Sequence, residues 1–232
     1  MGYRELVKDL EKLKNPGKAK IFQRFFKTGK GEYGEGDVFW GLTVPQTQSV
    51  TKNYLQLSLE DIQKLLEQKI HECRWSACMI LNSQYKKAGQ KEKEKLARFY
   101  LKNARKFNNW DLVDTTAPKI LGDYLFDKDK SILYEFAVSG NLWERRISIM
   151  ATAGFIDKNQ FKDTLKIAEI LLNDKQDLIH KAVGWMLREV GKRDLKTEEK
   201  FLQKYVSGMP RTMLRYAIEK FPEAKRKKYL AK

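Results

Sequence analysis

The feature that most constrains this chain is a helical pattern that recurs at a nearly constant interval. Its starting positions lie 35, 37, 35 and 30 residues apart. These starting residues are Arg74, Asn109, Arg146, Lys181 and Arg211. An interval of this size suits two helices and two turns per repeat, and each helix pair can bury its apolar face only against its neighbours. We therefore predict an all-α fold of HEAT-like repeats, stacked into a curved α-solenoid with a basic concave groove.

Apolar residues at helical spacing support this fold along most of the chain, and no segment shows the alternation of a half-buried strand. We expect helices over residues 3–14, 58–69, 72–85, 91–106, 129–138, 142–151, 158–172, 176–191, 197–205 and 211–219. A further helix carries Phe25 and Phe26, and Pro45 opens another. We predict one HEAT-like domain over residues 1–232. Residues 1–44 form atypical N-terminal helices and a glycine-rich loop, and residues 45–232 form the repeat body.

The glycine spacing and the small numbers of cysteines and histidines exclude several classes of site. The glycine-rich stretch 28–37 lacks the GxxxxGK[ST] order of a phosphate-binding loop, and no strand precedes it. The two cysteines, Cys73 and Cys78, have neither zinc-pair spacing nor a disulfide framework. With His71 and His180 as the only histidines, no metal site and no Ser-His-Asp arrangement can be assembled. We expect no metal and no cofactor.

The N-terminal sequence and the hydropathy indicate where the protein acts. The first residues contain no apolar segment of a secretory signal. No apolar run approaches the ~18 residues that a membrane-spanning helix needs. We therefore expect a cytoplasmic protein that does not bind membranes.

A formal net charge of +16 predicts attraction to a polyanion, and nucleic acid is the first candidate. In a helical solenoid, one helix of each pair lines the concave surface, where cations would meet the phosphates of a duplex. The cations expected there are Arg145, Lys181, Arg188, Arg211 and Arg215, together with Arg74 and Arg146. The alternative is that several of them pair with acids of their own helices, such as Glu144 and Glu189, and that the charge serves only solubility.

The run Asn109-Trp110-Asp111-Leu112-Val113-Asp114 in the middle of the chain is the first candidate site. Asn108 or Asn109 can cap a helix that begins here. Trp110 and Asp114 are four residues apart and therefore share one face, whereas Asp111 points elsewhere. Pro118 then ends this helix or opens the next. The alternative interpretation places Trp110 in the core and leaves Asp114 as a solvated surface acid.

Two distant segments supply partners for this pair. Arg146 falls at a repeat start, and its planar guanidinium suits a phosphate. Trp185 lies one turn after Lys181, and Gly184 beside it predicts either close packing or a close ligand. We assign Trp75 and Trp143 to the core. Trp110, Asp114, Arg146 and Trp185 together would make an aromatic box with one acid and one cation, which suits a cation or a sugar that becomes cationic in its transition state.

These segments resemble the AlkD-type DNA alkylation repair family. The similarity is carried by the run 109–114, the run Trp143-Glu144-Arg145-Arg146, the run 181–189 (KAVGWMLRE) and the entry YGEGDVFWG at 33–41 followed by Val44-Pro45. It covers nearly the whole chain in the same order. The resemblance implies a HEAT-like DNA glycosylase that removes positively charged N3- and N7-alkylated purines from double-stranded DNA.

The resemblance also implies a role for each candidate residue. Asp114 matches the family's catalytic aspartate, and Trp110 and Trp185 match the two tryptophans that flank the deoxyribose of the lesion. Arg146, rather than Arg145, matches the active-site arginine, because it follows Trp143 by three residues. The family's DNA contacts from its N-terminal helices cannot be assigned to residues of this chain, because this segment departs from the family's sequence pattern. A monomer is expected, because a wrapped duplex gives no need for a second subunit.

Two further hypotheses remain open beside the glycosylase. One is a non-catalytic HEAT-like nucleic-acid-binding protein whose aromatic box is idle. The other is a scaffolding solenoid whose charge only keeps it soluble. Release of alkylated purines from DNA separates the first hypothesis from both of these.

Overall fold

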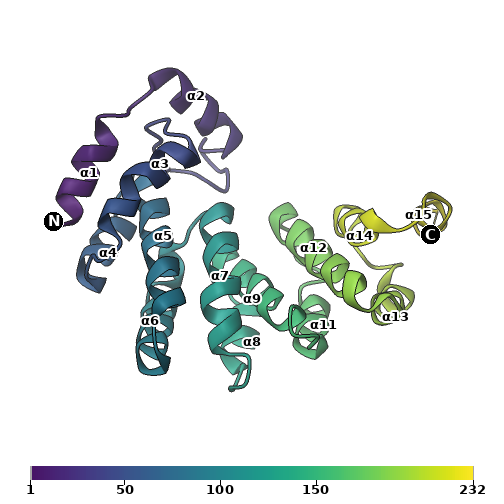
Figure 1. Cartoon of the computed structure of the whole chain (residues 1–232). Coiled ribbons are helices and arrows are strands. Elements are labelled where there is room, and N and C mark those ends of the chain that lie inside the picture. The colour runs from purple at the N-terminus through teal and green to yellow at the C-terminus, as the bar shows by residue number, and fades with distance from the viewer. Residues whose placement is uncertain (1, 232) are drawn as a thin grey trace. The chain divides into compact units, whose positions relative to one another are not determined.

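The computed structural model describes residues 2–231, and it is all-α over that range. An isolated parallel β-bridge joins Val38 and Ile70. The chain divides into two compact units, Met1–Thr116 and Ala117–Lys232. Consecutive helices joined by short connections pack on one another within each unit, as in HEAT-like repeats. The predicted all-α, HEAT-like fold is confirmed (Figure 1), whereas the single domain over 1–232 and the basic groove stay predictions.

The first unit carries six helices before the candidate site. They are α1 (Tyr3–Glu11), α2 (Pro16–Phe25), α3 (Val44–Thr51), α4 (Leu59–Leu66), α5 (His71–Lys87) and α6 (Gln90–Lys102), with the 3₁₀ helices η1 (Lys52–Tyr54) and η2 (Ala104–Lys106). Side-chain caps start α2 and α4: Asn15 Oδ1 accepts from Lys18 N at 3.0 Å, and Ser58 Oγ accepts from Asp61 N at 3.1 Å. Helix α5 packs on α3, α4 and α6 and has eleven buried residues.

The second unit is arranged around one long helix. Its elements after the unit boundary are α8 (Ser131–Ala137), α9 (Leu142–Ala151), α10 (Ala153–Ile156), α11 (Lys162–Ile170), α12 (Asp177–Arg193), α13 (Leu195–Tyr205), α14 (Arg211–Ala217), η3 (Ile218–Lys220) and α15 (Glu223–Leu230). Helix α12 packs against α9, α11, α13 and α14. The boundaries of α9 agree with the expected range, whereas α10 and α15 were not expected from the apolar pattern.

Helix α7 (Trp110–Tyr124) corrects one expectation, because Pro118 lies inside it rather than at an end. A proline within a helix removes one backbone hydrogen bond, here the bond to the carbonyl of Asp114, and costs about 3 kcal/mol. The helix persists because it buries an apolar face. Leu112, Val113, Ala117, Ile120 and Leu121 are all fully buried. The boundary between the two units falls within this helix, after Thr116.

Gly184 in α12 marks close packing against α14, which resolves the two alternatives raised by the sequence. A Cβ atom at this position would lie 2.3 Å from the carbonyl oxygen of Met213 and 2.6 Å from Cβ of Tyr216. Neither atom is the end of a flexible side chain, so a larger residue would push the two helices apart. Gly184 therefore sets the approach of α14 to the helix that carries Trp185.

We expect Gly184→Ala to lower the free energy of unfolding by about 1–3 kcal/mol, because overpacking outweighs the better helix propensity of alanine. Gly140→Ala is the matched control in the same unit, since no atom lies within 4 Å of its Cβ position. Urea unfolding followed by circular dichroism measures both. Equal stabilities of the two variants would contradict the packing role of Gly184.

Candidate functional site

Trp110 and Asp114 lie four residues apart on α7 and therefore leave the helix on the same face. The helix begins at Trp110, and Asn109 Oδ1 accepts a 2.8 Å hydrogen bond from the Trp110 backbone amide. Both side chains are partly exposed. Trp75 and Trp143, in contrast, are only 9% and 6% exposed, which confirms their assignment to the core. Trp110 is thus available at the surface beside a carboxylate, as the same-face prediction requires.

The Trp110 indole packs against the end of α2 and the residue that follows it. Phe26 stacks on the indole with ring centroids 5.3 Å apart and an interplanar angle of 12°. Phe25 meets it edge-on at 6.0 Å and is itself 63% exposed. Offset stacking of this kind restrains an aromatic ring in both tilt and position. The atypical N-terminal segment therefore supports the candidate site directly, through contacts that the sequence did not reveal.

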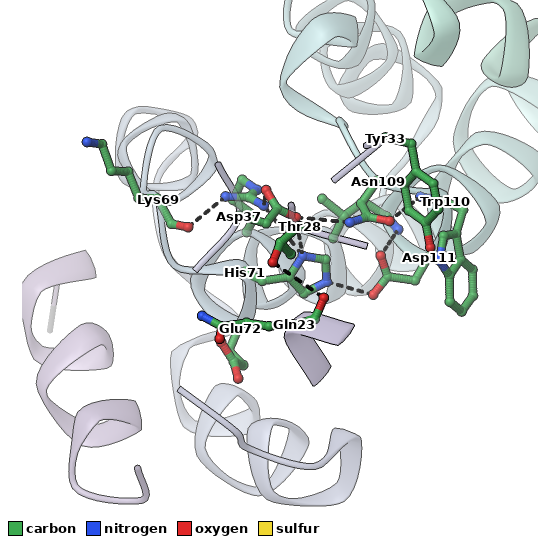
Figure 2. Close-up of polar contacts among 12 residues, drawn as sticks. Gln23, Thr28, Tyr33, Asp37, Lys69, His71, Glu72, Asn109, Trp110 and Asp111 are labelled. Atoms are coloured by element: carbon green, nitrogen blue, oxygen red, sulfur yellow. Dashed lines mark hydrogen bonds and ion pairs between the residues drawn. The ribbon is translucent and has the colours of Figure 1, made fainter. Parts of the chain in front are cut away.

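A largely buried polar network adjoins Trp110 through its neighbours Asn109 and Asp111 and was not predicted (Figure 2). His71 Nε2 lies 2.8 Å from Asp111 Oδ2, and His71 Nδ1 lies 3.1 Å from Asp37 Oδ2. Arg74 Nη2 donates to Asp37 Oδ1 at 2.5 Å, and Asn109 Nδ2 donates to Asp37 Oδ2 at 2.9 Å. These groups come from the glycine-rich loop, the start of α5 and the start of α7. We call Asp37, His71, Arg74, Asn109 and Asp111 the Asp37–His71 network.

The charge of His71 follows from this geometry. A neutral imidazole has one N–H and can donate at only one ring nitrogen, whereas both nitrogens here face carboxylate oxygens. Burial alone would lower the pKa of His71, but the charge of Asp111 and hydrogen bonds to Asp111 and Asp37 raise it to about 9. Burial would likewise raise the pKa of Asp37, yet His71 and Arg74 hold it below its ordinary value. The network thus pairs two acids with two cations.

These contacts distinguish the two aspartates of the run. Asp111 faces inward to His71, and its side chain is only 15% exposed. Asp114 is partly exposed on the face that carries Trp110. The geometry thus assigns Asp111 to the Asp37–His71 network, and the choice of Asp114 as the catalytic acid stays a prediction.

Arg146 and Trp185 lie in the second unit. Trp185 is part of α12, and Arg146 lies on α9 and forms a hydrogen bond to α12. Arg146 is buried, and its Nη1 donates to the carbonyl of Leu178 in the first turn of α12 at 2.5 Å. Trp185 is partly exposed, and its Nε1 donates to Glu189 Oε1 at 3.1 Å. The structure places Trp110 and Asp114 on α7, and it places Arg146 on α9 and Trp185 on α12 of the second unit. That all four residues form one site stays a prediction.

The predicted DNA-binding cations differ in how they are paired. Arg145 Nε contacts Asp174 Oδ2 at 2.6 Å, and Lys181 Nζ contacts Asp177 Oδ2 at 2.7 Å. Arg188 forms ion pairs with Glu219 and, at 3.4 Å, with Glu189. The expected pairing with an acid of the same helix is therefore confirmed for Lys181 and Arg188.

The other two predicted DNA-binding cations, Arg211 and Arg215, are exposed. Arg211 Nη2 donates to the carbonyl of Leu230 at 2.6 Å. A DNA-binding role of these five cations stays a prediction.

Two further features are absent from residues 2–231. No group of three or more His, Cys, Asp or Glu side chains in this range could hold a metal ion. None of the helices in the same range is long and apolar enough to cross a membrane.

The comparison with known proteins identifies the family. A family model described as DNA alkylation repair enzyme matches residues 6–221. The chain belongs to the DNA alkylation repair enzyme family. This match confirms the resemblance stated above and supports a role in the repair of alkylated DNA. No curated protein matches the chain.

A solved structure shares the fold of this family member. It is a predicted DNA alkylation repair enzyme from Enterococcus faecalis, with a TM-score of 0.73 and 19% sequence identity. The match covers 90% of this chain and 97% of that one. At this level of identity, the likeness establishes the fold alone.

The raised pKa of His71 predicts a pH dependence of stability. Because the folded-state pKa of about 9 exceeds the ordinary 6.5, the contribution is fully present below about pH 6.5 and is lost as pH rises through 9. It amounts to on the order of 3 kcal/mol. Urea unfolding of wild type and His71→Gln between pH 6 and 10 measures it, and the difference between the two should shrink with rising pH. A difference that stays constant would contradict a charged His71.

Proposed function

We propose that this protein is a DNA glycosylase that hydrolyses the N-glycosidic bond of positively charged N3- and N7-alkylated purines, such as 3-methyladenine and 7-methylguanine. The reaction would begin base excision repair of duplex DNA. The observation that carries the proposal is the partly exposed carboxylate of Asp114, one turn from Trp110 on α7, in a chain of the DNA alkylation repair family.

The chemistry requires little from the protein. Alkylation at N3 or N7 makes the base cationic, so it leaves as a neutral molecule with the electron pair of the glycosidic bond, without a general acid. The sugar then carries the positive charge, which the Asp114 carboxylate stabilises electrostatically. Water adds at C1′ and loses a proton to solvent, and Asp114 can orient this water. This sequence needs neither a nucleophilic side chain nor a cofactor.

The remaining predicted site residues take supporting roles. Trp110 and Trp185 would pack their electron-rich faces against the sugar, whose C–H groups become more positive as the bond breaks. Arg146 would hold a backbone phosphate through its planar guanidinium. The net charge of +16 supports the sequence-independent attraction to the duplex that such an enzyme requires. The convergence of these residues on one lesion is part of the proposal.

The non-catalytic alternative is supported by the acid-paired cations described above. Arg145, Lys181 and Arg188 each have a carboxylate partner, so a phosphate must compete with that acid. A protein that binds duplex weakly and releases no base would fit this alternative. A scaffolding protein would bind duplex no better than other polyanions.

We expect Asp114→Asn to slow the release of 7-methylguanine from methylated duplex by about 10²–10³-fold, as loss of one transition-state electrostatic contact does elsewhere. Asp123→Asn is the matched control, because it changes the same residue type in α7. Asp123 follows Asp114 by nine residues, or about 2.5 helical turns, so it lies on the opposite side of the helix. Single-turnover release of base measures both. Equal release by wild type and Asp114→Asn would contradict the catalytic assignment.

We expect binding to unmodified duplex to weaken as salt rises, because bound phosphates release their counterions. Arg215→Gln should reduce the slope of log affinity against log salt by about 1. Arg98→Gln is the control, because it removes the same charge from an exposed α6 residue outside the predicted set. Fluorescence anisotropy over a range of salt concentrations measures the slopes. A salt-independent affinity of the wild type would contradict phosphate binding.

A further inference from the structure

We propose that His71 is a positioning residue for Trp110, and that it holds the indole in its reactive orientation by binding Asp111 and Asp37 at once. The proposal rests on the proposed function, because the orientation matters only if Trp110 packs on the reacting sugar. His71 itself is buried and does not reach the reacting atoms. It acts through the first turn of α7.

Both sequence neighbours of Trp110 are tied to the same buried groups. Asp111, which follows Trp110, accepts from His71 Nε2 at 2.8 Å. Asn109, which precedes it, donates to Asp37 Oδ2 at 2.9 Å, and the same oxygen lies 3.1 Å from His71 Nδ1. A residue whose two neighbours are both tethered has little freedom in its backbone torsions. The Asp37–His71 network therefore restrains the backbone from which the Trp110 indole projects.

The same imidazole also supports the aromatic rings that stack on Trp110. His71 packs on Phe39 with centroids 4.5 Å apart and on Phe26 at 5.0 Å. Phe39 and Phe26 stack at 4.8 Å, and Phe26 stacks on Trp110 at 5.3 Å. His71 thus contacts both the polar tether and the aromatic stack that restrain the indole.

The backbone fixes His71 in this place. Its amide donates to the carbonyl of Val38 at 2.8 Å, and the amide of Val38 donates to the carbonyl of Lys69 at 3.1 Å. This bridge joins the glycine-rich loop to the start of α5, so Asp37 arrives next to the imidazole. The charged groups that face His71 are Asp37 from the loop, Arg74 from α5 and Asp111 from α7.

Two conservative variants separate positioning from mere stability. In His71→Gln the side-chain amide reaches the place of Nε2 and keeps the donor to Asp111. In His71→Asn the amide reaches only the place of Nδ1, so it keeps the donor to Asp37 and loses Asp111. A purely structural role predicts that the two variants behave alike. A positioning role predicts that the glutamine variant retains more activity.

The main measurement is single-turnover release of 7-methylguanine, with affinity for unmodified duplex measured separately. We expect His71→Asn to slow release by about 10–100-fold, because small misplacements of this kind have large effects on rate. Its affinity for the duplex should change less than about 2-fold, since its phosphate contacts are untouched. His71→Gln should recover most of the rate. Equal losses of rate in the two variants would overturn the proposal.

Ser76→Ala is the control for general destabilisation of α5. Ser76 is fully buried on the same helix, and its hydroxyl accepts from Thr51 Oγ1 at 2.9 Å without touching the network. Its rate of release should equal that of the wild type. If His71→Asn does not fold, Asp111→Ala removes the same tether from a side chain that is 15% exposed, and the same slowing is expected.

A second readout does not depend on glycosylase activity. The indole ¹⁵N–¹H resonance of Trp110, assigned with Trp110→Phe, should shift in His71→Asn and stay near its wild-type position in His71→Gln. If the wild type releases no base, the proposed function is wrong, but the indole resonance still tests the positioning. An unshifted resonance in His71→Asn would overturn the positioning role even in an active enzyme.

Discussion

The Asp37–His71 network pairs two acids with two cations where the glycine-rich loop, α5 and α7 come together, and the candidate site depends on this pairing. Removing a charge from water costs several kcal/mol unless an opposite charge and hydrogen bonds replace the solvent. His71 meets this requirement by donating to Asp37 and to Asp111, and Arg74 completes the neutral set. Loss of one member would leave the others buried without compensation. This requirement fixes the position of the first turn of α7, and Trp110 with it.

Helix α7 is held by side-chain burial rather than by an unbroken backbone ladder. Pro118 cannot donate to the carbonyl of Asp114, yet the helix continues to Tyr124 over a fully buried apolar face. In the second unit, α12 has a comparable role, because Gly184 allows α14 to approach and Trp185 follows it directly. In both units, a candidate tryptophan lies next to a position where packing leaves little room for movement.

The sequence predicted the helices more successfully than the contacts between them. The spacing of apolar residues located most helices, because burial of one helical face is a local signal. Helix α15 was not predicted from this spacing, since five of its eight residues are charged. The prediction that α7 ends or a new helix begins at Pro118 was wrong, because the apolar packing that offsets the cost of this proline is not visible in a local pattern.

The Asp37–His71 network could not be predicted for a different reason. Its contacts join residues 34, 37, 40 and 72 positions apart. The available signal was one histidine and one aspartate far apart in the sequence, which is too common to indicate a pair. Trp110 and Asp114 were recognisable because their spacing of four residues is a property of a single helix. Whether they share a site with Arg146 and Trp185 depends on how the two units are placed, which no local pattern determines.

The central claim is that these four residues act on one alkylated nucleotide. A crystal structure bound to duplex DNA containing a pyrrolidine abasic nucleotide tests it most directly, because the protonated ring mimics the cationic sugar of the transition state. We predict that the Asp114 carboxylate and the indoles of Trp110 and Trp185 contact this ring, and that Arg146 contacts an adjacent phosphate. A complex in which Trp185 or Arg146 lies on a different face from Asp114, away from the ring, would contradict the account.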